Sequence, residues 1–173
     1  MKKLLIVVDM QNDFIDGALK NPAAQRIVQP MCEFIDSWNG DICFTEDTHD
    51  EDYLDTPEGL KLPIPHCIKG TYGQEVNNDL IIRAMKNKNE TFFVTKHTFG
   101  YDRWDTFHLD EKYDEIVMCG TCTDICVISN ALILKALYPN IKITIMKDLC
   151  AGLTEENHKS AISVMESCQC EIK

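Results

Sequence analysis

The sequence contains no apolar run that approaches the roughly 20 residues of a transmembrane helix. The apolar run near the start, in MKKLLIVVDMQNDF, ends at Asp9 and no small-residue cleavage site follows, which argues against a secretory signal. Positive charge is scarce: 17 Lys and Arg against 28 Asp and Glu give a formal net charge of −11, which argues against nucleic acid or an anionic membrane as a partner. We therefore expect a cytoplasmic protein. The chain has no internal repeats or low-complexity segments, and its 173 residues suit one domain with a sizeable core.

Cysteine, by contrast, is abundant, and the chain has nine. Several of them, such as Cys43 and Cys119, fall inside apolar, strand-like runs, where reduced cysteines commonly pack as small hydrophobic residues. We therefore expect reduced cysteines rather than a disulfide framework, with at least one reactive thiol among them.

Short apolar runs alternate with segments of helical spacing along the chain. We expect strands at residues 4–8, 42–45, 91–95, 116–119, 141–146 and 170–172, and helices near residues 23–38, 74–87, 123–138 and 154–167. This alternation predicts a three-layer α/β/α fold with a mostly parallel, doubly wound sheet of about six strands. We expect residues 1–173 to form a single domain.

One long segment, residues 46–73, interrupts this alternation. It is acidic and contains three prolines, two histidines and two tyrosines. A loop of this length in a compact domain is usually functional or disordered, and its composition favours an ordered, functional loop.

The segment 115–130, EIVMCGTCTDICVISN, predicts a strand, a tight turn and a helix. We expect Thr123 to be the N-cap of this helix, with Cys126 in its first turn. A thiol there faces unpaired backbone N–H groups and the positive end of the helix dipole, and both lower its pKa. Cys126 is therefore a candidate nucleophile; the alternative is that it is only a buried small side chain.

Ionisable side chains follow other expected strands. Asp9 ends the first strand and Lys96 follows the third. Because ligands of open parallel sheets bind beyond the C-terminal ends of the strands, we expect both residues to share one rim with Cys126. Lys96 would favour the thiolate and Asp9 would accept the thiol proton, while backbone N–H groups of Cys122 and Cys126 could form an oxyanion hole. This set suits nucleophilic attack on an amide.

The long loop supplies a second group of candidate residues. Asp47 and His49 are two apart in an expected extended segment, so their side chains share one face. His66 follows a stiff Pro-Ile-Pro run, and Glu58 lies between the two histidines in sequence. Imidazoles with carboxylates suit Zn²⁺, Fe²⁺ or Mn²⁺, although solvated histidines in an acidic loop are equally common.

Four motifs stand in these contexts: VDMQNDF at residues 8–14, DTH at 47–49 with PHCIKGT at 65–71, TK at 95–96, and GTCTDICV at 120–127. With them the chain resembles the isochorismatase-like cysteine hydrolases over essentially its whole length, and within that superfamily the nicotinamidase/pyrazinamidase branch. The resemblance implies a catalytic triad of Asp9, Lys96 and Cys126. It also implies a cis peptide between Thr121 and Cys122 that turns the Cys122 N–H toward the oxyanion.

The same resemblance implies one divalent metal ion, with Zn²⁺ as the first candidate and Fe²⁺ or Mn²⁺ as alternatives. The implied ligands are Asp47, His49 and His66, with Glu58 as a possible further one. In such enzymes the metal binds the pyridine nitrogen and presents the carboxamide to the thiolate. Relatives of this kind also suggest a homo-oligomer.

The resemblance is weakest in the substrate pocket. It implies Phe14 as an aromatic wall and Thr121 as a substrate-binding residue. A Trp that often stands three residues before the metal-binding histidine is replaced here by Pro63, and the segment after the lysine reads HTFGYDRW. We expect Phe99 or Trp104 to supply the missing stacking surface.

The expected activity is hydrolysis of a small carboxamide through a thioester, with conversion of nicotinamide to nicotinate and ammonia as the first candidate. An N-carbamoyl amidase or an isochorismatase-type hydrolase with the same triad is the alternative. A thiol redox protein using the Cys119-x-x-Cys122 pair is disfavoured because Cys119 falls within the strand. A structural zinc site that adds Cys126 is disfavoured because the spacing lacks a matching second pair and the metal would occupy the nucleophile.

Overall fold

The computed structural model describes residues 2–173, which form one six-stranded sheet. The strands lie in the order β3-β2-β1-β4-β5-β6, and every neighbouring pair is parallel. Their bounds are β1 Lys3–Val8, β2 Asp41–Asp47, β3 Thr91–Lys96, β4 Glu115–Thr121, β5 Lys142–Ala151 and β6 Glu171–Ile172. The predicted parallel, doubly wound sheet of about six strands is therefore confirmed.

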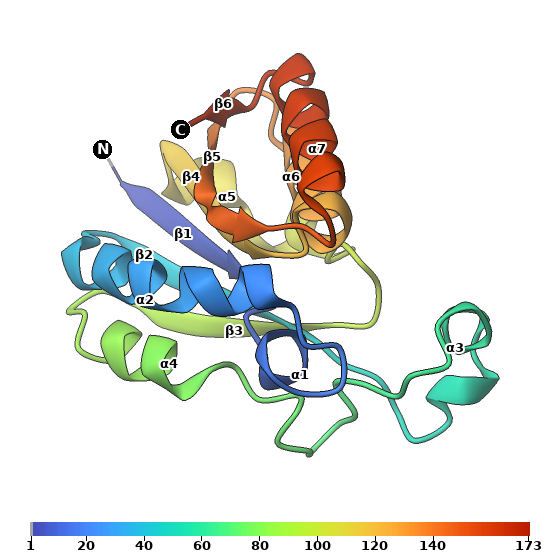
Figure 1. The fold of residues 1–173 in the computed structure, drawn as a ribbon. Coiled ribbons are helices and arrows are strands. Elements are labelled where there is room, and N and C mark those ends of the chain that lie inside the picture. The colour runs from blue at the N-terminus through green and yellow to red at the C-terminus, as the bar shows by residue number, and fades with distance from the viewer. Residues whose placement is uncertain (1) are drawn as a thin grey trace.

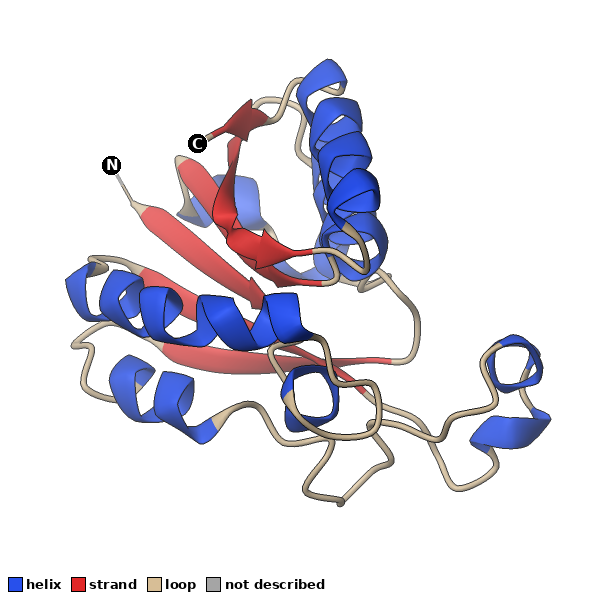
Figure 2. Ribbon diagram, in the orientation of Figure 1, coloured by secondary structure: helices blue, strands red, loops and turns tan. Residues whose placement is uncertain are grey.

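Helices cover both faces of this sheet (Figures 1 and 2). The α-helices are α1 Asn12–Ile15, α2 Pro22–Ser37, α3 Pro57–Lys61, α4 Asn78–Ala84, α5 Leu109–Lys112, α6 Ile128–Leu137 and α7 Glu155–Ser167. Helix α2 packs with α4, and α6 packs with α7. The chain moves in one direction from β1 to β3 and in the other from β4 to β6, so right-handed crossovers place these two pairs on opposite faces.

The central strand β1 explains the composition of the core. Its residues 4–8, LLIVV, have no exposed surface. A strand with helices on both faces has no polar face, and its sequence is therefore a continuous apolar run rather than an alternating one. Residues of all the longer helices join the same core.

The predicted helix boundaries differ from the structure in two places. Helix α4 begins at Asn78 rather than near residue 74, because the backbone of the preceding residues is hydrogen-bonded to the segment after β1: Asn77 N–H donates to Met10 O (2.8 Å) and Asn12 N–H to Glu75 O (3.0 Å). The predicted helix at 123–138 is divided into a π-helical turn, η3 Thr123–Val127, and α6.

The predicted N-cap of that helix is wrong. Cys122 occupies the N-cap position, and its carbonyl accepts from the N–H groups of Ile125 (3.0 Å) and Val127 (3.1 Å). The Thr123 side chain instead lies 2.9 Å from Nδ1 of His158, a residue of α7. At α7 itself, Thr154 is the N-cap and accepts from Asn157 N–H at 3.1 Å.

The long segment after β2 is ordered, and it carries α3 together with a 3-10 turn, η1 Tyr53–Asp55. Figure 1 shows these two elements standing away from the sheet, at the end of the molecule toward which β2 and β3 run. A second 3-10 turn, η2 Trp104–Phe107, follows β3. Within residues 2–173, no helix is long and apolar enough to cross a membrane.

Candidate active site and metal site

The structure brings the three predicted catalytic side chains together at the C-terminal ends of the strands. Asp9 follows β1, Lys96 is the last residue of β3, and Cys126 lies in η3 just after β4. Lys96 Nζ lies 2.7 Å from Asp9 Oδ2 and 3.7 Å from Cys126 Sγ. All three residues are buried, so their charges interact through protein rather than through water.

Two backbone features fix Asp9 in this position. Its φ of 47° lies in the left-handed region, and its N–H donates to both the carbonyl (3.3 Å) and the hydroxyl oxygen (3.1 Å) of Thr45 on β2. The Thr45 hydroxyl in turn donates to Asp9 Oδ1 at 2.5 Å. On the other side, Gly120 has φ +125° and packs so closely on β1 that a Cβ there would collide with Val8 O. Thr45 thus holds the Asp9 carboxylate, and Gly120 lets β4 approach the end of β1 closely.

The ionisation of the buried cluster differs from the sequence prediction. Burial, reinforced by the charge of Asp9, raises the pKa of the Cys126 thiol well above its usual value, and Lys96 only partly opposes this. The expected lowering of the pKa of Cys126 is therefore wrong, because desolvation and the charge of Asp9 outweigh the effect of the Lys96 cation. The resting nucleophile is a thiol that needs a base.

Asp9 and Lys96 form the complementary pair. Burial raises the pKa of Asp9, although the charge of Lys96 opposes the change. Burial alone would lower the pKa of Lys96, but the charge of Asp9, together with that of Asp47, outweighs it and raises that pKa. Lys96 therefore stays a cation. A carboxylate whose proton affinity is raised by burial is suited to take a proton from a neighbouring thiol.

The turn that holds Cys126 has the backbone that the resemblance implied. The peptide between Thr121 and Cys122 is cis. The Thr121 side chain is fully buried, and its hydroxyl donates to Ala151 O on β5 at 3.1 Å. The oxyanion-hole role of Cys122 and Cys126 and the substrate contact of Thr121 stay predictions.

The predicted metal ligands also converge. One donor atom each from Asp47, His49 and His66 lies within 4.8 Å of the others. Asp47 Oδ2 is 3.2 Å from His49 Nε2 and 3.8 Å from His66 Nε2, and Glu58 Oε1 is 3.9 Å from both Nε2 atoms. Two imidazoles and one or two carboxylates around one point are the donor set of a borderline divalent ion, so these residues fit the implied metal.

Neighbouring groups orient this donor set. Nδ1 of His66 lies 2.9 Å from Ile64 O, and a hydrogen bond there directs Nε2 to the metal site. The Tyr53 ring meets both imidazoles edge to face, with centroids 4.6 Å from His49 and 5.0 Å from His66. Asp47 Oδ1 lies 3.1 Å from Lys96 Nζ, so one carboxylate joins the metal site to the triad.

The structure places the three aromatic residues predicted for the substrate pocket in different surroundings. Phe14 is edge to face with His66, with centroids 5.6 Å apart, and so borders the metal site. Trp104 has no exposed surface: it packs against Tyr101, and its Nε1–H donates to Asn130 Oδ1 at 2.8 Å. The structure contradicts Trp104 as a stacking surface, because the ring is in the core. Phe99 is 47% exposed and is the remaining candidate.

The cysteine alternatives fit the structure poorly. All nine cysteines are free in the structure. Cys119 is completely buried within β4, and burial raises its pKa well above the usual value, which makes it a poor redox thiol. The metal-suited group described above contains no cysteine.

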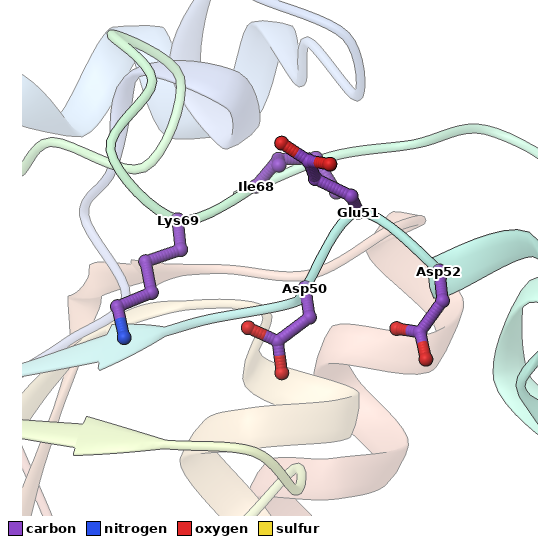
Figure 3. Close-up of a pocket in the computed structure, with 5 residues that line it drawn as sticks. All are labelled: Asp50, Glu51, Asp52, Ile68 and Lys69. Carbon is purple, nitrogen blue, oxygen red and sulfur yellow. The ribbon is translucent and has the colours of Figure 1, made fainter.

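A surface cavity of about 440 Å³ lies on the long loop, lined by residues next in sequence to His49 and close to His66 (Figure 3). Its lining residues are Asp50, Glu51, Asp52, Ile68 and Lys69. In Figure 3 the Asp50 carboxylate and the Lys69 ammonium point to the same side, whereas Glu51 points away from them. None of these residues belongs to the triad or to the metal ligands, so the cavity is not assigned to the substrate.

Comparison with known proteins shows the family to which the chain belongs. The model of the isochorismatase domain matches residues 3–172, and the chain therefore belongs to the isochorismatase family. A relative from Bacillus subtilis (strain 168), an uncharacterised isochorismatase family protein called PncA, is 31% identical over 94% of this chain and 93% of its own length.

Two solved structures share the fold along the whole chain. A pyrazinamidase/nicotinamidase from Streptococcus mutans UA159 has a TM-score of 0.86 and 28% identity, and the match covers 99% of this chain and 100% of that one. A pyrazinamidase from Pyrococcus horikoshii, solved in complex with zinc, has a TM-score of 0.79 and 25% identity, with 100% and 99% covered.

Proposed function

We propose that this protein is a metal-dependent cysteine amidohydrolase that converts nicotinamide to nicotinate and ammonia. The observation that carries the proposal is the contact of Lys96 Nζ with Asp9 Oδ2 at 2.7 Å and Cys126 Sγ at 3.7 Å, next to a donor set for a divalent ion. The similarity to nicotinamidases and pyrazinamidases supports the choice of substrate.

The reaction begins with proton transfer from Cys126 Sγ to the Asp9 carboxylate. The thiolate, held beside the Lys96 cation, attacks the carboxamide carbon, and the N–H groups of Cys122 and Cys126 stabilise the oxyanion. As the tetrahedral intermediate collapses, the C–N bond breaks and Asp9 returns its proton to the nitrogen, which leaves as ammonia. Asp9 then takes a proton from water, and the resulting hydroxide attacks the thioester. The C–S bond breaks to release the carboxylic acid, and Asp9 returns its proton to the departing Cys126 sulfur, which restores the thiol.

Asp47, His49 and His66 would hold the metal ion, with Glu58 as a further ligand. When bound, a divalent ion supplies a Lewis acid that fixes the ring nitrogen of the substrate. Phe14, packed against His66, and Phe99, with its exposed ring, would confine the ring from its sides. Zn²⁺ is the first candidate, because a similar pyrazinamidase was solved with zinc.

A cytoplasmic location is part of this proposal, because cysteines buried inside strands, such as Cys43 and Cys119, suit a compartment where thiols stay reduced. Assembly into a homo-oligomer stays a prediction from the resemblance.

The test is ammonia release by the purified protein from nicotinamide, pyrazinamide and an N-carbamoyl amino acid, before and after chelation and again after adding Zn²⁺. We expect the two aromatic amides to be hydrolysed, the activity to be lost on chelation and Zn²⁺ to restore it. Preference for the N-carbamoyl compound with no loss on chelation would favour the alternative branch and overturn the proposal. Isochorismate, assayed by loss of its vinyl ether, tests the isochorismatase type.

A further inference from the structure

The candidate metal ligands come from the C-terminal end of β2 with the residues just after it and from the long loop, and these two segments are hydrogen-bonded to each other. His49 follows the end of β2, and His66 lies in the returning part of the long loop. His49 N–H donates to Cys67 O at 3.0 Å, and Lys69 N–H donates to His49 O at 2.9 Å. These bonds set the two histidines relative to each other, but they do not fix the pair relative to the triad.

Gln11 connects the segment of Asp47 to the segment that carries Asp9. Its side chain is fully buried, and its amide pairs with the backbone of Asp47 in both directions: Asp47 N–H donates to Gln11 Oε1 at 2.8 Å, and Gln11 Nε2 donates to Asp47 O at 2.8 Å. The same Nε2 donates to Gln74 O at 2.7 Å. Each polar atom of this amide therefore has a hydrogen-bond partner. The side chain satisfies the backbone N–H and C=O of Asp47 as a neighbouring strand would.

Asp13 makes the second connection, on the other segment. Its Oδ2 accepts from Cys67 N–H at 2.7 Å and its Oδ1 accepts from Ala18 N–H at 2.9 Å. Cys67, the residue directly after His66, has a φ of 46°, a conformation that non-glycine residues rarely adopt without support. Gly73 packs on the Asp13 carboxylate, where a Cβ would collide with it, so the loop leaves room for this side chain.

We propose that Gln11 and Asp13 are positioning residues of the metal site: Gln11 fixes the backbone of Asp47, and Asp13 fixes the backbone next to His66. Both residues follow Asp9 within one short segment. The same segment therefore carries the catalytic base and sets the two ligand-bearing segments relative to it. This role rests on the proposed function only in that the site binds a metal ion.

The test uses two variants of nearly unchanged shape. Gln11→Glu keeps the acceptor for Asp47 N–H but turns the two donated hydrogen bonds into contacts between a carboxylate and carbonyl oxygens. Asp13→Asn cannot accept from Cys67 and Ala18 together, because one of its two atoms becomes a donor. The metal-free proteins are titrated with Zn²⁺ against a chromophoric chelator and with Co²⁺ in the absorption spectrometer. We expect Zn²⁺ affinity to fall about 10- to 100-fold, with altered Co²⁺ ligand-field bands.

Asp41→Asn is the matched control. Asp41 also accepts a backbone N–H, from Glu90 at 3.1 Å, and a hydroxyl, from Tyr113 at 2.9 Å, but it lies at the opposite end of β2 from Asp47. We expect it to lower the melting temperature of the metal-free protein and to keep the wild-type Zn²⁺ affinity and Co²⁺ spectrum.

Wild-type affinity and spectrum in both site variants would overturn the proposal. An equal loss of affinity in Asp41→Asn would also overturn it, because the effect would then reflect general destabilisation. Asp13 is only partly buried, so Asp13→Asn decides the matter should Gln11→Glu fail to fold. A wild-type protein that binds Zn²⁺ but releases no ammonia would overturn the proposed function alone, and the affinities of the variants would still measure the positioning role.

Discussion

The two ends of the same sheet each hold a cluster of paired charges, and the two clusters differ in their access to water. At the N-terminal end, Glu115 of β4 lies 2.9 Å from Lys3 Nζ and 3.4 Å from Lys142 Nζ, and it accepts from the Thr144 hydroxyl at 2.8 Å. At the C-terminal end, Lys96 lies between Asp9 and Asp47. Both ends pair lysine with carboxylate.

The lysines show the difference. The side chains of Lys3 and Lys142 are 37% and 43% exposed, whereas that of Lys96 has no exposed surface. Burial works to raise the pKa of Glu115, but the hydrogen bonds from Lys3 and Thr144 outweigh it and lower that pKa. At the other end, burial dominates and raises the pKa of Asp9 and of Cys126. The water-accessible ion pairs of Glu115 therefore favour its ionised form. The buried ion pair of Asp9 and Lys96 leaves Asp9 with a raised proton affinity, so that it can accept a proton from Cys126.

The largest effect is expected from the nucleophile. Cys126→Ala should lower kcat for ammonia release by about 10⁴-fold or more, because no thioester can form. Circular dichroism and metal content should match the wild type. Cys168→Ala is the control, since Cys168 is an exposed free cysteine outside the site. Appreciable turnover by Cys126→Ala would contradict the assignment of the nucleophile.

The lysines of the two ends should differ in stability. Lys96→Met leaves two buried carboxylates without their cation and should lower the free energy of unfolding by about 3–5 kcal/mol. Lys3→Met removes a half-exposed partner of Glu115 and should cost about 1 kcal/mol or less. Urea unfolding of both variants, without added metal, measures the contrast. Similar losses of unfolding free energy in the two variants would show that access to water does not decide how much each lysine contributes to stability.

The pH dependence of stability should have opposite sign at the two ends. Because the pKa of Asp9 is raised above 3.8, its contribution to the free energy of unfolding is present below that value and lost as pH rises through the raised pKa. The pKa of Glu115 is lowered below 4.5, so its contribution is present above that value and lost as pH falls through the lowered pKa. Differences between wild type and Asp9→Asn, and between wild type and Glu115→Gln, follow these slopes in urea unfolding across the acid range. Slopes of equal sign would refute the comparison.

The sequence predicts the fold and the convergence of Asp9, Lys96 and Cys126 for one reason. In a parallel sheet, side chains that follow different strands meet at one edge, so strand recognition alone brings them together. Periodicity also identifies the strand and the helical region around Cys126, but not the π-helical turn, which depends on which N–H groups reach Cys122 O.

The predictions that depended on how deeply a side chain is buried were wrong. The pKa of Cys126 is decided by desolvation against the Lys96 charge, and the sequence does not give the depth of burial. Trp104 reads equally well as a pocket wall or a core residue until its contact with Asn130 is seen. The hydrogen bonds of Gln11 join segments 36 and 63 residues apart, and only the motif around it marked the residue in advance.

The smallest effect is expected from substitution of Glu58, whose exposure to water is intermediate between that of the two clusters. Its side chain is 27% exposed, and its Oε1 lies 3.9 Å from Nε2 of both His49 and His66. A partly solvated carboxylate contributes less than a buried one, so Glu58→Gln should weaken Zn²⁺ binding by about tenfold or less and leave stability without metal unchanged. His66→Ala, which removes a buried ligand, should weaken binding much more. Equal losses in the two variants, measured by chelator competition, would show that solvent access does not grade the ligands and that Glu58 holds the metal as firmly as the histidine does.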